Sequence, residues 1–127
     1  MSNVIKYLVL FSTFLIFTNC NVLKDNYYKT ETFEIIRKKS NDKTTQMIVN
    51  CYDSLDESKI PAGILINGVF FNPFPKNNVK AVLFPNIFDV EIFYIGKQSI
   101  KIQKLSIKSG DSIVVNVHMK ENLTPLY

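Results

Sequence analysis

Few side chains in this 127-residue chain are of the types that perform chemistry, and their spacing does not assemble a catalytic motif. They are two cysteines, one histidine and a short acidic group: Cys20, Cys51, His118, Asp53, Asp56 and Glu57. A cysteine nucleophile needs a positioned base. His118 is distant from both cysteines in sequence, and no third group is evident that would orient its ring. The sequence therefore predicts a protein without catalytic residues.

Metal binding is not predicted either. One histidine without paired cysteines does not make a zinc motif, and Asp53, Asp56 and Glu57 lack the regular spacing of oxygen ligands in a Ca²⁺ loop. We therefore expect a solvated acidic loop, no metal and no cofactor. Cys51 ends an apolar stretch that begins at Met47, so its simplest role is that of a small buried hydrophobic residue.

The N-terminal twenty residues form the most informative segment. Lys6 precedes an almost wholly apolar run over 7–17, and Phe17-Thr18-Asn19 leads directly to Cys20. A positive start followed by an apolar middle is typical of a secretory signal. A cysteine at the end of such a segment resembles a bacterial lipoprotein signal. The resemblance implies a signal peptide over residues 1–19, attachment of lipid, palmitate included, at Cys20, and a membrane-anchored protein of the cell envelope.

Two alternatives remain open for this segment. An uncleaved single-pass anchor would need about 20 apolar residues, and Val4 and Ile5 lengthen the run only part of the way. A Cys20–Cys51 disulfide is the other alternative, because the environment outside the cytoplasm permits disulfides. A lipid on Cys20 would leave Cys51 without a partner in the chain.

Charge does not point to nucleic acid as a partner. The net charge of +4 includes Lys6, and the remaining lysines are interleaved with acidic residues. The densest cluster, Arg37-Lys38-Lys39, is short for a nucleic-acid-binding run. It predicts either a solvated strand end or linker, or a weak contact with anionic headgroups. No acidic run follows Cys20, which favours a periplasm-facing orientation over the cell surface.

The hydrophobic pattern predicts a polar tether over residues 20–43 and an all-β domain over 44–127. Within the tether, residues 32–37 are compatible with one strand or a helical turn. Strands are predicted at 47–52, 64–71, 79–84, 88–95, 99–107 and 112–119, with a turn at Asn67-Gly68. A change of phase near Gln103-Lys104 indicates a β-bulge or a break between two short strands. Several short strands separated by turns indicate a small β-sandwich or barrel.

The order of these segments resembles the carboxypeptidase regulatory-like domain. The stretches that carry the resemblance are Ile48–Asp53, Ile60–Gly68, Phe93–Lys97 and Gly110–Val117. The resemblance covers about two thirds of the chain and implies a transthyretin-like β-sandwich that acts as an accessory module. An immunoglobulin-like sandwich is the alternative all-β arrangement, although the chain has no tryptophan and no internal cysteine pair.

An unusual aromatic stretch, Phe70-Phe71-Asn72-Pro73-Phe74-Pro75, interrupts the strand pattern. The prolines prevent the whole stretch from continuing a central strand. Phe70, Phe71 and Phe74 are therefore candidates for contact with a partner or membrane surface. Alternatively, Phe71 and one other ring cap the core, which we favour because phenylalanine is so often buried.

Together these features predict a lipid-anchored envelope lipoprotein whose β-sandwich is a binding or structural accessory module. The expected partners are the membrane and an outer-membrane receptor or another envelope protein. A small periplasmic enzyme or enzyme inhibitor, or a single-pass membrane-anchored protein, is the alternative.

Overall fold

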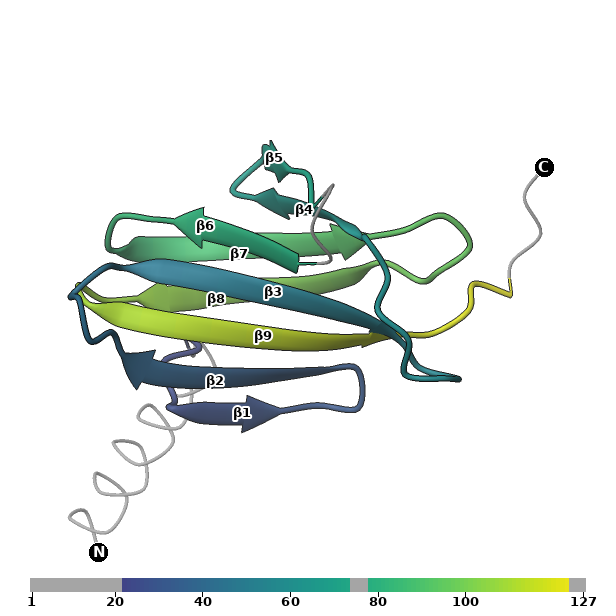
Figure 1. Ribbon diagram of the computed structural model, residues 1–127, viewed down its shortest axis with the longest axis horizontal. Helices are drawn as coiled ribbons and strands as arrows, with labels where there is room; N and C mark the ends of the chain where they lie inside the picture. The colour runs from purple at the N-terminus through teal and green to yellow at the C-terminus, as the bar shows by residue number, and fades with distance from the viewer. Residues whose placement is uncertain (1–21, 74–77, 124–127) are drawn as a thin grey trace, which may run out of the picture.

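The computed structural model describes residues 22–73 and 78–123, and the regular elements in these ranges are strands. Figure 1 shows them as two facing sheets. The strands are β1 (Tyr27–Lys29), β2 (Phe33–Lys39), β3 (Gln46–Asp53), β4 (Gly63–Ile66), β5 (Val69–Phe71), β6 (Asn78–Val82), β7 (Asn86–Phe93), β8 (Ile100–Ile107) and β9 (Asp111–Met119). The predicted all-β sandwich is confirmed. Within the described ranges, no helix has the length and apolar character needed to cross a membrane.

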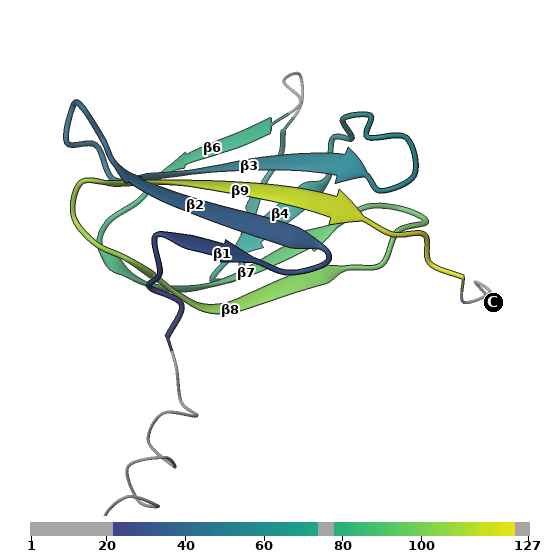
Figure 2. The same cartoon turned by 90° about the horizontal axis from the view of Figure 1, so that it is seen from below.

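The larger sheet has the strand order β1-β2-β9-β3-β6, and the smaller sheet has the order β5-β4-β7-β8. Neighbouring strands run antiparallel with the exception of β3 and β9, which are parallel. The C-terminal strand β9 thus lies in the middle of the larger sheet, between β2 and β3 (Figure 2).

The core lies between the two sheets and follows from strict alternation along the strands. On β9, Ile113, Val115, Val117 and Met119 are fully buried, whereas intervening residues such as His118 face outward, as predicted. From the smaller sheet, buried positions of β4, β7 and β8 complete the core: Ile64, Ile66, Phe88, Val90, Ile92, Ile100, Ile102, Leu105 and Ile107.

The predicted bulge in β8 is confirmed. Phe88 pairs with Leu105 and Val90 pairs with Ile102, so two residues of β8 lie opposite the single residue Asp89. The second of these two residues, Lys104, has a φ of 56°. Its backbone N–H donates to the Asp89 carboxylate at 3.0 Å. The bulge restores an inward position to Leu105, which explains the change of phase in the sequence.

The predicted polar tether over residues 20–43 is wrong for most of its length. Residues of β1 and β2 belong to the larger sheet, and β2 pairs along its whole length with β9. Ile35 is 1% exposed and is part of the core. The physical reason is that β9, which is apolar on its inner face, needs a partner on each side, and the alternating Phe33, Ile35 and Arg37 provide one.

The first described residues, which precede β1, already belong to the fold. Leu23 forms a bridge with Leu105 of β8. Its N–H donates to the Lys104 carbonyl at 2.8 Å, and its carbonyl accepts from the Ser106 N–H at 2.9 Å. Three residues later, the carbonyl of Asn26 accepts from the N–H of Arg37 in β2. The segment 23–26 therefore links the β8 edge of one sheet to the other sheet.

Candidate functional site

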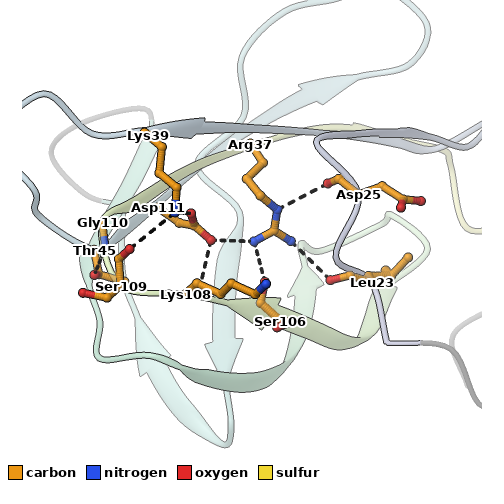
Figure 3. Close-up of polar contacts among 10 residues, drawn as sticks. All are labelled: Leu23, Asp25, Arg37, Lys39, Thr45, Ser106, Lys108, Ser109, Gly110 and Asp111. Carbon is orange, nitrogen blue, oxygen red and sulfur yellow. Dashed lines mark hydrogen bonds and ion pairs between the residues drawn. The ribbon is translucent and has the colours of Figure 1, made fainter.

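A buried ion cluster lies where β2, β9 and the N-terminal segment meet (Figure 3). Arg37 occupies an inward position of β2, and its side chain is 8% exposed. Its guanidinium donates to Asp111 Oδ2 at 2.8 Å and to the Ser106 carbonyl at 2.6 Å. It also donates to the carbonyls of Leu23 at 3.2 Å and Asp25 at 3.3 Å. One side chain thus joins both sheets and the N-terminal segment.

Asp111 is the acidic partner, and its side chain is 2% exposed. Besides Arg37, it accepts from Lys39 Nζ and from the backbone N–H of Lys108, at 2.8 and 2.9 Å. Burial opposes ionisation of this carboxyl, but the hydrogen bonds from Lys39, Lys108 and Arg37 outweigh it, and its pKa lies below the ordinary value. Arg37 is therefore not part of a solvated strand end. Lys39 is 71% exposed at its side chain.

Because the pKa of Asp111 is lowered, part of the protein's free energy of unfolding should be lost in acid. A carboxyl with a depressed folded-state pKa stabilises the protein above its unfolded pKa of about 3.9. That contribution is lost as the pH falls through the lower folded pKa. Urea unfolding at pH 7, 5 and 3 should therefore show a smaller loss on acidification for Asp111→Asn than for wild type. Lys39→Gln, which removes only the exposed partner, should reduce the loss less, and equal pH dependence in all three proteins would contradict the assignment.

A cavity of about 310 Å³ adjoins the cluster. Its lining consists of five cationic residues, one amide and one carboxylate: Lys24, Arg37, Lys38, Lys39, Lys108, Asn26 and Asp111. Arg37 and Lys39 are paired with Asp111. Among residues 22–73 and 78–123, no carboxylate lies within ion-pair distance of Lys24, Lys38 or Lys108. The cavity therefore has an excess of positive charge.

Cys51 and His118 lie on opposite faces of the larger sheet, so they do not form a nucleophile–base pair. Cys51 is 3% exposed and faces the core, as predicted. Burial raises the pKa of its thiol to about 12, which keeps it protonated at neutral pH. On the outer face, His118 stacks on Tyr52 with the ring centroids 5.4 Å apart. Cys51 has no disulfide partner within the described residues, and Cys20 lies outside them, so the structure does not test the alternative disulfide.

The carboxylates of the acidic loop, Asp53, Asp56 and Glu57, each lie beside a different neighbour. Asp53 forms an ion pair with Lys97 at 2.8 Å, and Asp56 accepts from the N–H of Ser58 at 2.9 Å. Glu57 Oε2 lies 3.1 Å from His118 Nδ1, without the alignment of a hydrogen bond. The parallel register of β3 and β9 brings these two residues together although they are far apart in sequence. In the described part of the chain, no three His, Cys, Asp or Glu side chains are placed to hold a metal ion.

The two described aromatic candidates, Phe70 and Phe71, differ in how far they are buried. Phe71 is half-buried against the core, in agreement with its predicted capping role. Phe70 is 54% exposed, and its ring centroid lies 5.9 Å from that of Phe93. Gly63 accommodates this pair, because a Cβ there would come within 2.8 Å of the Phe93 ring. Phe74 lies outside the described residues. Phe70 and Phe93 thus form a small exposed aromatic pair.

Comparisons with protein-family models and with curated proteins find no match to this chain. The site must therefore be interpreted from its own geometry. In the sequence, Arg37 and Lys39 were notable only as members of a basic cluster, and Asp111 only as part of the stretch Gly110–Val117. One pattern in the sequence could have indicated that Arg37 is buried. Side chains two positions apart on a strand share a face, so Arg37 lies on the same face as the core residue Ile35.

Proposed function

We propose that this protein is a lipid-anchored lipoprotein of the cell envelope, facing the periplasm, whose β-sandwich is a non-catalytic binding or structural module. The observation that carries the proposal is the short distance in sequence between Cys20 and the first described contact with the sandwich, at Leu23. Leu23 is hydrogen-bonded to β8 and lies three residues after Cys20. Cleavage before Cys20 would therefore remove a signal-like apolar segment and leave every described strand intact.

The same position defines how a lipid anchor would hold the domain. Three residues span at most about 11 Å when fully extended. A lipid on Cys20 would thus keep the sandwich against the membrane surface, with no long tether between them. A module held this closely is suited to bind or support envelope proteins in the same membrane, and an outer-membrane receptor is one such partner. The exposed Phe70–Phe93 pair is an apolar surface for that contact.

The placement of Cys51 and His118 supports a non-catalytic role. The only thiol in the described residues is buried and protonated, and the histidine lies on the opposite face of the sheet. This arrangement favours the accessory module over the enzyme.

The test is the intact mass and cell fractionation of wild type, Cys20→Ala and the matched control Cys51→Ala. We expect wild type and Cys51→Ala in the membrane fraction, with the mass of a lipid-modified chain that begins at Cys20. Cys20→Ala should lose the lipid mass and the lipoprotein cleavage. An uncleaved chain that stays in the membrane in all three proteins would instead establish a transmembrane anchor. A cleaved chain without lipid would also overturn the proposal.

A further inference from the structure

We infer that the cationic cavity beside Arg37 is the face with which the domain rests on the membrane, and that it receives the phosphate groups of anionic lipid headgroups. The inference rests on the proposed lipid anchor and adds to it an orientation and a lipid class. It concerns the cavity lined by Lys24, Arg37, Lys38, Lys39 and Lys108.

The first step is location. Lys24 lines the cavity and follows Leu23, which the hydrogen bonds to β8 hold in place. Cys20 is four residues before Lys24, and four residues span at most about 14 Å, so a lipid on Cys20 would be held near the cavity. The carbonyl of Leu23 also accepts from the Arg37 guanidinium, as Figure 3 shows. The anchored segment and the floor of the cavity are therefore one connected structure.

The second step is charge. The single negative charge of Asp111 pairs with both the buried Arg37 and the exposed Lys39, so it offsets only one of these two positive charges. Lys24, Lys38 and Lys108 come from three separate segments, are exposed, and have no carboxylate within ion-pair distance among the described residues. Several lysines that lie close together are attracted to a surface of negative charge. The uncompensated charge of the cavity thus matches a phosphate-bearing surface.

The third step distinguishes headgroups from a free anion. A selective site for a soluble anion holds its ligand with buried, pre-oriented donors. Here the buried donor, Arg37, already has carboxylate and carbonyl partners, and the remaining cations are exposed ammonium groups on flexible side chains. Exposed lysines suit a surface of many mobile headgroups, to which they contribute as point charges.

The experiment uses the protein recovered from membranes, reconstituted into vesicles of phosphatidylcholine with or without phosphatidylglycerol. Each lysine is modified with an amine-reactive reagent and measured by peptide mass spectrometry. We expect labelling of Lys24, Lys38 and Lys108 to fall several-fold when phosphatidylglycerol is present. The exposed lysines Lys59, Lys80 and Lys101 should keep their labelling. About 1 M salt reduces the screening length to about 3 Å and should restore the labelling of Lys24, Lys38 and Lys108.

A pair of double variants tests whether the cavity acts as a unit. In Lys24→Gln/Lys108→Gln, the protection of Lys38 by phosphatidylglycerol should be largely lost. The matched control Lys59→Gln/Lys101→Gln removes the same number of charges and should leave Lys38 protected. Equal labelling of both lysine groups in both vesicle types would overturn the inference. Protection by inorganic phosphate in phosphatidylcholine vesicles, as strong as that by phosphatidylglycerol, would assign the cavity to a soluble anion and also overturn it.

Failure of the lipid anchor is distinguishable from failure of this inference. If the recovered chain has no lipid mass, the proposed function is wrong, and the same vesicles are then added to the protein from solution. Selective protection of Lys24, Lys38 and Lys108 by phosphatidylglycerol would still support the cavity as a headgroup site. Equal labelling there would overturn it independently of the anchor.

Discussion

Replacement of Arg37 by methionine is expected to lower the free energy of unfolding by about 3–5 kcal/mol, because it leaves the buried Asp111 carboxylate without its buried cationic partner. Asp111 is 2% exposed at its side chain and cannot turn to water without a change in the fold. The substitution also removes donors from the carbonyls of Ser106, Leu23 and Asp25. Urea unfolding at pH 7, followed by circular dichroism, measures the loss.

Two further variants define the cause. Lys38→Met changes the exposed neighbour on the same strand and should alter stability by less than about 0.5 kcal/mol. Arg37→Met combined with Asp111→Leu removes both buried charges, and this variant should regain part of the lost stability. A double variant that is clearly less stable than Arg37→Met alone would contradict this interpretation, because Asp111→Leu would then have an independent cost of its own.

Ile35→Ala is expected to destabilise the domain by about 2–5 kcal/mol, since it leaves a cavity in the core. Ile35 is 1% exposed and packs between the sheets from β2. The neighbouring Ile36 points to the other face of the same strand and is only half-buried. Ile36→Ala is therefore a matched control, with the same change of side chain and an expected loss well below that of Ile35→Ala. Thermal and urea unfolding of both variants measure the difference.

This comparison tests directly whether β2 belongs to the domain. A tether outside the fold would make both alanine substitutions neutral. Equal, small effects of Ile35→Ala and Ile36→Ala would therefore contradict the structure and restore the tether predicted from the sequence.

The strands from β3 onward were predictable because their inward positions are apolar. On β9, the series from Ile113 to Met119 gives an unbroken period of 2, and in β8 the phase change at Lys104 correctly indicated the bulge. On β2, by contrast, the third inward position is Arg37, so the alternation ends in a charge and resembles a polar segment. The sequence pattern was therefore weakest where the fold uses a buried ion pair.

The ion cluster itself was not predictable for a different reason. Arg37 and Asp111 are 74 positions apart and meet only because β2 pairs with β9 in one register, Arg37 opposite Ile113 and Lys39 opposite Asp111. The contact between His118 and Glu57 depends in the same way on the parallel pairing of β3 and β9. Local patterns predict which face a side chain occupies, whereas these partners depend on strand order.

The central position of β9 has a consequence for the order of folding. Both β2 and β3 have β9 as a neighbour, yet β9 is the last of the described strands to emerge during synthesis. Until it does, the larger sheet exists only as the separate pairs β1–β2 and β3–β6, and its long-range pairings with β2 and β3 must wait for β9. The larger sheet of this topology is therefore completed only when β9 is inserted between β2 and β3, whereas the smaller sheet contains no strand later than β8.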